Sequence, residues 1–152
     1  MKRTVLAALC VAAAYAAPMA AADPLTYDGL KTMLTGMGYT PKDIGKTSPK
    51  IEILVVTDAF NVPIGLEITP SGRFIWATAN LGESKIDGDR ALQLLKRAPD
   101  WQPTQFWLTS SNTLTIGLAI NNTDIKPDLM KFALEKIAGD VSKSSDVWQA
   151  SN

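Results

Sequence analysis

Four aspartates stand where helices are expected to begin, and paired carboxylates of this kind can act as general acid and base. Asp87 and Asp89 form one pair, and Asp124 and Asp128 lie on either side of Pro127. Negative charge is also favoured at a helix N-terminus by the helix dipole, which explains both pairs without chemistry. No acidic cluster has the spacing of a calcium-binding loop. We therefore predict no metal site among these residues.

Serine hydroxyls are the next candidates, because a nearby base can turn them into nucleophiles. Four of them, Ser48, Ser71, Ser110 and Ser111, stand in expected turns and loops; none lies in a G-x-S-x-G motif, and the sequence contains no histidine to activate one. A dyad of Ser48 with Lys46 or Lys50 stays open, although nothing in the spacing selects it. We expect no catalytic residue and no cofactor, and thus a protein that is not an enzyme.

Residues 1–22 have the features of a secretory signal peptide. Two basic residues precede an apolar run over residues 4–17 that is too short to span a bilayer. Ala20 and Ala22 then occupy the −3 and −1 positions of an A-x-A cleavage site before Asp23. The sequence predicts a periplasmic or secreted protein without a membrane span, whose mature chain, residues 23–152, forms one domain.

The composition of this mature chain excludes several kinds of partner. Cys10 is the only cysteine and leaves with the signal peptide; Leu9 before it argues against a lipoprotein acceptor. The mature chain then has no disulfide and no Cys/His zinc site. It carries 13 basic and 15 acidic side chains, a balance that does not attract nucleic acid or an anionic membrane.

Hydrophobic periodicity predicts the elements of this domain. A helix starts at Asp23 and Pro24 and ends near Gly36 and Gly38; another runs from Asp87 to Ala98, where Pro99 stops it, with Ala91, Leu94, Leu95 and Ala98 inward. The last helix begins at Pro127, with an inner side formed by Met130, Ala133, Leu134, Ile137, Ala138 and Val141. Strands are expected at 50–58, 64–69, 73–80, 104–109 and 113–120, with turns at Asn61–Pro63 and Pro70–Gly72.

The predicted order is α-β-β-β-α-β-β-α. Five strands without β-α-β alternation favour an α+β fold, in which helices pack on one face of a mainly antiparallel sheet.

Several segments of the chain resemble the YbjN family of putative bacterial sensory transduction regulators. They are the helix end Leu34–Tyr39, the strands Ile64–Ile68 and Ser71–Ile75, the strand start Asn112–Leu114 and the helix start Ile125–Leu129. The resemblance implies a fold similar to type III secretion chaperones and a non-enzymatic protein that binds another polypeptide or itself. The predicted signal peptide sets this chain apart from intracellular members of the family.

Aromatic residues give the main indication of a binding surface. Phe74, Trp76 and Trp107 lie in expected strands that are apolar on both faces. The segment Ile53–Val56 of the first expected strand is also apolar on both faces. Helices on one face of the sheet leave the other face to be covered by a partner protein, a peptide or a second copy of the chain. We therefore predict a protein- or peptide-binding module with Phe74, Trp76 and Trp107 at its partner-binding surface.

The main alternative is a small-molecule-binding domain, whose sheet and helices would enclose an apolar pocket lined by Trp and Phe. An enzyme is the third possibility, and it would show carboxylate, Lys and Ser side chains converging in a cleft.

Overall fold

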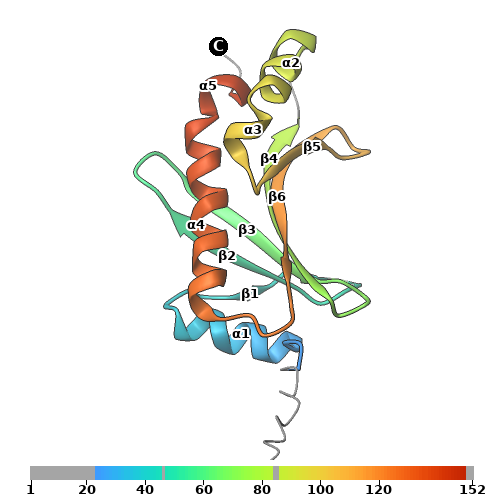
Figure 1. Cartoon of the computed structure of the whole chain (residues 1–152), viewed down its shortest axis with the longest axis vertical. Helices are drawn as coiled ribbons and strands as arrows, with labels where there is room; N and C mark the ends of the chain where they lie inside the picture. The colour runs from blue at the N-terminus through green and yellow to red at the C-terminus, as the bar shows by residue number, and fades with distance from the viewer. Residues whose placement is uncertain (1–22, 46, 84–85, 150–152) are drawn as a thin grey trace, which may run out of the picture.

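The computed structural model describes residues 23–45, 47–83 and 86–149, so the predicted signal peptide lies outside the described residues. Figure 1 shows a long helix lying across a strongly twisted sheet, with shorter helices at both ends. The elements are α1 (Tyr27–Gly36), β1 (Lys42–Asp43), β2 (Lys50–Val56), β3 (Asn61–Ile68), β4 (Phe74–Glu83), α2 (Gly88–Lys96), α3 (Ala98–Trp101), β5 (Gln105–Leu108), β6 (Thr113–Asn121), α4 (Pro127–Lys143) and α5 (Ser145–Trp148).

All six strands belong to one antiparallel sheet, in the order β1-β2-β3-β4-β6-β5. The helices lie on one side of the sheet, and α4 packs on β6, β2, β4 and β3 (Figure 1). This arrangement confirms the predicted α+β class, with six strands in place of five. β1 and β5 are the two edges of the sheet.

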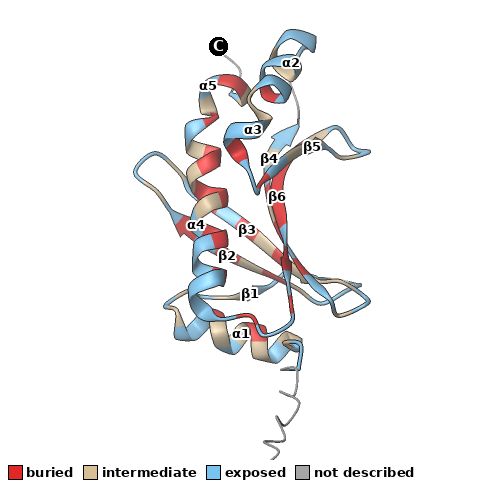
Figure 2. Ribbon diagram, in the orientation of Figure 1, coloured by how far each residue is buried: buried red, intermediate tan, exposed pale blue. Residues whose placement is uncertain are grey.

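The long helix α4 has one apolar side, which it turns toward the sheet. Pro127 opens it, at a position where a missing N–H costs no helical hydrogen bond. Figure 2 shows the buried residues along the side of α4 that faces the strands. All six positions predicted to point inward are buried, and Asp140 is buried beside them.

Alternation along the strands gives the sheet a covered face and an open face. In β4, Ile75, Ala77 and Ala79 are buried under the helices, whereas Phe74 and Trp76 point the other way and are exposed. β2 repeats the pattern. We call the side turned away from α4 the open face.

Two predictions about the first strands are wrong. The sheet has a further edge strand, β1, which pairs with β2 and was missed because it has only two residues. The expected turn at Asn61–Pro63 is part of β3, and the chain turns earlier, where Thr57 bonds Phe60 through both backbone and side chain. Pro63 is tolerated in β3 because the pairing with β4 covers only Gly65–Ile68.

The expected start of the first helix and the expected end of the second also need correction. α1 begins at Tyr27 instead of Asp23, because the Thr26 hydroxyl accepts a hydrogen bond from the Gly29 N–H at 3.1 Å and caps the helix. α2 ends at Lys96, and Pro99 stands in the first turn of α3 instead of ending a helix.

The other two corrections concern single side chains. Leu95 was expected to point inward, but it is 71% exposed. Asp124 does not stand at the helix start, because it occupies a turn with φ of 52°.

The covered side contains two apolar clusters of unequal size. The larger, which we call the main core, fills the space between α1, α4 and strands β2, β3, β4 and β6. The smaller, which we call the end cluster, has Leu94, Leu114 and Val147 as its buried members and lies beneath α2 and α5.

Candidate functional site

The three aromatic residues predicted at the partner-binding surface lie on two strands. Phe74 and Trp76 on β4 are 38% and 41% exposed. Trp107 on β5 packs edge-on against Trp76, with ring centroids 6.0 Å apart and an angle of 68° between the rings. The sheet order brings these tryptophans together because β6 alone separates β4 from β5. Phe74 stands two residues before Trp76, on the same face.

A hollow lies beside the Trp76–Trp107 pair, and we call it the trough. Strand register places Gly65, Thr78 and Gly117 side by side in one row of the open face. A side chain at position 117 would meet the Ala77 carbonyl, because a Cβ there would stand 2.3 Å from that oxygen. The trough has a volume of about 360 Å³ and is lined by Lys50, Glu67, Trp76, Thr78 and Trp107.

Charged and hydroxyl groups lie at one end of the trough. The Ser48 hydroxyl donates a hydrogen bond to Glu67 Oε1 at 3.1 Å, so its partner is a carboxylate. Glu67 is half-buried on the open face. Lys46, the other proposed partner of Ser48, lies outside the described residues. The arrangement provides one cation and one carboxylate beside two indole rings.

Apolar side chains extend the open face away from the trough. Leu54 is 53% exposed and Val56 is 70% exposed, and both point from β2 toward the same side as Trp76. Isolated exposed apolar residues are common, but several of them on one face of a sheet are typical of a binding surface.

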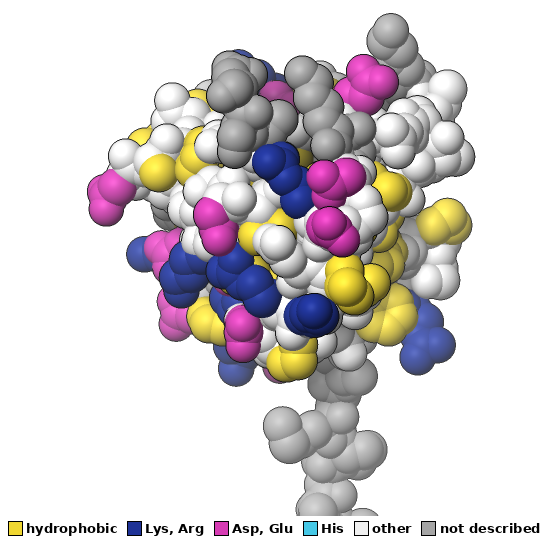
Figure 3. All heavy atoms as spheres, turned by 90° about the horizontal axis from the view of Figure 1, so that it is seen from above, with side chains coloured by type: hydrophobic (Ala, Val, Ile, Leu, Met, Phe, Trp, Pro, Cys, Tyr) yellow, Lys and Arg dark blue, Asp and Glu magenta, His cyan; other side chains and the backbone are white. Residues whose placement is uncertain are grey.

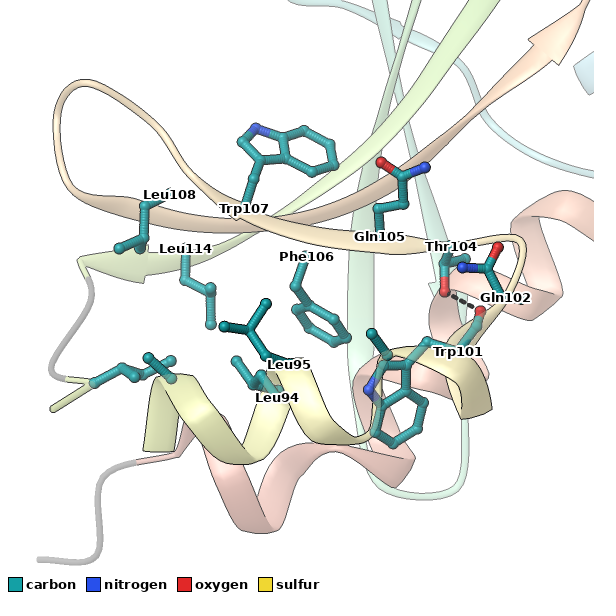
Figure 4. Close-up of a pocket in the computed structure, with 13 residues that line it drawn as sticks. Leu94, Leu95, Trp101, Gln102, Thr104, Gln105, Phe106, Trp107, Leu108 and Leu114 are labelled. Carbon is teal, nitrogen blue, oxygen red and sulfur yellow. Dashed lines mark hydrogen bonds between the residues drawn. The ribbon is translucent and has the colours of Figure 1, made fainter. Parts of the chain in front are cut away.

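A second hollow lies on the helical side of β5, and we call it the end pocket. Seen from the end of the molecule that carries α2, hydrophobic side chains gather along one side of the surface (Figure 3). The end pocket also has a volume of about 360 Å³. Its lining comes from α2, α3, β5 and the start of β6 (Figure 4), and consists of Ile86, Ala91, Leu94, Leu95, Ala98, Trp101, Gln102, Thr104, Gln105, Phe106, Trp107, Leu108 and Leu114.

Trp101 forms the inner wall of the end pocket and was not singled out from the sequence. Its ring packs edge-on against Phe106, with centroids 6.0 Å apart, and the Arg97 guanidinium lies 4.7 Å from its centroid. Trp101 is 3% exposed, and its indole Nε1 has no hydrogen-bond partner among the described residues. A buried N–H without an acceptor is unusual in a folded protein.

A buried polar network holds the loop that follows Trp101. Asp140 of α4 accepts hydrogen bonds from Thr104 and from Lys136, and it is 2% exposed. Lys136 also donates to the Trp101 carbonyl at 3.0 Å. The network ties α4 to the start of β5 and thereby fixes Trp101 in the wall of the end pocket.

Asp87, one of the acidic residues considered for catalysis, has a structural role. It caps α2 by accepting a hydrogen bond from the Arg90 N–H at 2.9 Å, as its place in the sequence suggested.

Within the described ranges, no three or more Cys, Asp or Glu residues gather as a metal site would require. None of the helices in those ranges is both long enough and apolar enough to cross a membrane.

Chains of two solved protein complexes are similar to this fold. One is a chain of the heterodimeric complex ExoU-SpcU from the type III secretion system of Pseudomonas aeruginosa, with a TM-score of 0.58 and 13% identity over 79% of this chain and 98% of that one. The other belongs to the HopA1-SchA chaperone-effector complex, with a TM-score of 0.53 and 12% identity over 80% of this chain and 91% of that one. No family model and no curated protein matches the chain. At these identities the similarity is one of fold, and it confirms the type III secretion chaperone-like architecture.

Proposed function

We propose that this protein is a non-enzymatic, chaperone-like module that binds another polypeptide on the open face of its sheet. The observation that carries the proposal is the Trp76–Trp107 pair beside the trough, in which Trp76 is exposed and Trp107 is half-buried. The similar structures support it, because one of them is by its name a chaperone bound to an effector.

The chemistry of the open face suits an extended polypeptide. The trough is large enough for a side chain of the partner, and the indole rings supply apolar contact area at little entropic cost. Lys50 and Glu67 line the trough and can pair with either sign of charge. Leu54 and Val56, farther along the same face, offer exposed apolar contacts to further side chains.

We also propose that the chain is an exported protein of the YbjN type. The proposal rests on the predicted cleavage site before Asp23 and on the resemblance of its segments to that family. Intact-mass measurement of protein recovered from the periplasm tests the export: a chain beginning at or near Asp23 supports it, and a full-length mass in the cytoplasm contradicts it.

Capture from a periplasmic extract, followed by mass spectrometry, tests the binding surface. Trp76→Ala should reduce the retained partner at least 30-fold, because truncating a large aromatic anchor costs about 2 kcal/mol or more. Phe132→Ala is the matched control, since Phe132 is 56% exposed but belongs to α4 on the other side of the molecule. Equal capture by both folded variants would reject the open face as the binding surface.

A second copy of the chain could occupy the same surface as a partner. Light scattering of the purified protein, compared with Trp76→Ala, distinguishes this case. A dimer that dissociates in the variant makes the open face a self-association surface, whereas an unchanged monomer leaves it for a different polypeptide.

A further inference from the structure

We propose that the end pocket is a second binding site, which takes an uncharged, mostly apolar small molecule carrying a carbonyl-type oxygen. That oxygen accepts a hydrogen bond from Trp101 Nε1. The end pocket adjoins the trough at Trp107, which lines both, but it lies on the helical side of β5 and its donor, Trp101, belongs to it alone, so this inference does not rest on the proposed function.

The shape of the end pocket fits a small molecule. Its volume of about 360 Å³ lies within the range of small-ligand sites. Leucine and aromatic side chains from α2 and β5 face each other across the hollow (Figure 4). Two sides are therefore preformed, one from helices and one from the edge of the sheet.

Trp101 specifies the polar group of the ligand. An indole N–H is only a donor, and it is satisfied only by an acceptor. Trp101 Nε1 has no such acceptor among the described residues, and Figure 4 draws this nitrogen on the edge of the ring that is turned toward Leu95 and Phe106. A ligand oxygen between these side chains would satisfy the buried donor.

The lining also specifies the charge of the ligand. None of the described residues that line the end pocket is charged. Burying an ion there would remove its hydration without supplying a counter-ion, which is strongly unfavourable. The Thr104 hydroxyl in the lining is already bonded to Asp140 and to the Trp101 carbonyl, and Gln105 points to the open face, which leaves Trp101 Nε1 as the polar group that selects a neutral ketone, ester or amide.

Leu95 controls access to Trp101. The nitrogen is covered in the structure, so a ligand must displace a side chain to reach it. Leu95 lines the pocket and is 71% exposed, which leaves it free to rotate outward. Its neighbour Leu92 is 47% exposed on the same helix but does not line the pocket.

Nuclear magnetic resonance of the ¹⁵N-labelled protein provides the test, with propiophenone and propylbenzene as probes. The two probes share a carbon skeleton, and only propiophenone has an acceptor oxygen. The four tryptophans of the sequence give separate indole N–H signals, and Trp101→Phe identifies one of them by its loss. Propiophenone should shift the Trp101 signal downfield in a saturable way, and propylbenzene should bind without that shift.

Affinities in the variants separate hydrogen bonding from packing. Trp101→Phe should weaken propiophenone about fivefold, the value of one ordinary hydrogen bond, and leave propylbenzene nearly unchanged. Leu95→Asp places a charge at the mouth and should weaken both probes at least tenfold, whereas the matched control Leu92→Asp should keep both affinities. Phe74→Ala, on the open face, should not affect either probe.

Three results would overturn the proposal. The first is the absence of saturable binding by either probe. The second is an equal loss of both probes in Trp101→Phe, because Trp101 would then contribute packing alone. The third combines two observations: neither probe binds, and Leu95→Asp loses capture of the polypeptide partner whereas Leu92→Asp keeps it. That result would assign the end pocket to the polypeptide partner.

Discussion

The main core and the end cluster lie on the same side of one sheet, but they differ in size and in how completely their apolar side chains are buried. The main core joins two helices to four strands, and its largest side chains are fully buried. The end cluster has three buried members, and Leu92, Leu95 and Leu108 around it are exposed. The main core therefore makes a rigid support, whereas the end of the molecule keeps apolar side chains accessible.

This difference explains where the end pocket can exist. A hollow of about 360 Å³ inside a close-packed core would remove many dispersion contacts and would tend to collapse. Beneath α2 few groups are available to fill the space, because α2 is short and contacts the rest of the chain mainly through α3 and α5. Leucines that find no buried place there remain at the mouth of the pocket.

The largest expected effect compares one leucine from each cluster. Leu134→Ala in α4 removes a side chain with 0% exposure and should lower the free energy of unfolding by about 2–5 kcal/mol, as should Leu66→Ala in β3. Leu94→Ala in α2 should cost no more than the low end of that range, about 2 kcal/mol, because its cavity adjoins an existing hollow. Urea denaturation measures both. Equal losses at Leu134 and Leu94 would show that the end cluster is packed as firmly as the main core.

A smaller effect concerns the polar network that joins the two regions. Lys136→Met removes the ammonium that pairs with the buried Asp140 and should cost about 1–3 kcal/mol, since a buried carboxylate loses a charged partner. The control is Lys131→Met, whose exposed pair with Glu135 on the same helix has a distance of 3.8 Å and should contribute less than about 1 kcal/mol. Similar losses from the two substitutions, measured by urea denaturation, would mean that the buried network does not brace the Trp101 loop.

Local patterns in the sequence were sufficient to predict which residues of α4 are buried in the main core. The 3.6-residue period of α4 gave all six of its inward apolar positions. The prediction succeeds because one continuous side of the helix is covered, so burial follows directly from periodicity.

The features that could not be predicted from the sequence depend on contacts between residues far apart in the chain. β1 exists because it pairs with β2 and because Asp43 bonds to Tyr27 of α1. Asn122, which was not singled out from the sequence, is fully buried and its amide bonds to Leu25 and to the Gly72 carbonyl. No local pattern signals such a contact.

The two candidate sites differ in the same way. Trp76 and Trp107 could be named because their strands are apolar on both faces. The trough beside them could not, because it requires the register that sets Gly65, Thr78 and Gly117 in one row. The end pocket requires α2 to stand opposite β5, and Leu95 looked like a core residue from its spacing alone.

The smallest expected effect concerns the contact of α1 with β1, at the opposite end of the main core. The Tyr27 hydroxyl donates to Asp43, and Lys31 Nζ lies 2.9 Å from the same carboxylate. The bond to Asp43, followed by desolvation, raises the pKa of Tyr27 to about 12. The hydrogen bonds from Tyr27 and Lys31 lower the pKa of Asp43 below its model-compound value of 3.8.

These shifts set two pH windows for the stability that the contact supplies. The raised pKa of Tyr27 gives a contribution that is complete below about pH 10 and is lost as the pH rises through about 12. The lowered pKa of Asp43 gives one that is present above about pH 4 and is lost as the pH falls further. Tyr27→Phe removes both contributions, so it should lower the unfolding free energy slightly between about pH 4 and 10, because most of the contact is exposed to solvent, and should change it least at the two extremes, where the contact is already lost. Tyr39→Phe is the matched control: burial and the nearby Glu135 raise the pKa of Tyr39, so that variant should change the alkaline limb and leave the acid limb intact. An acid limb that is unchanged in Tyr27→Phe would show that Asp43 is held by Lys31 alone, and that α1 is joined to the edge of the sheet without the tyrosine.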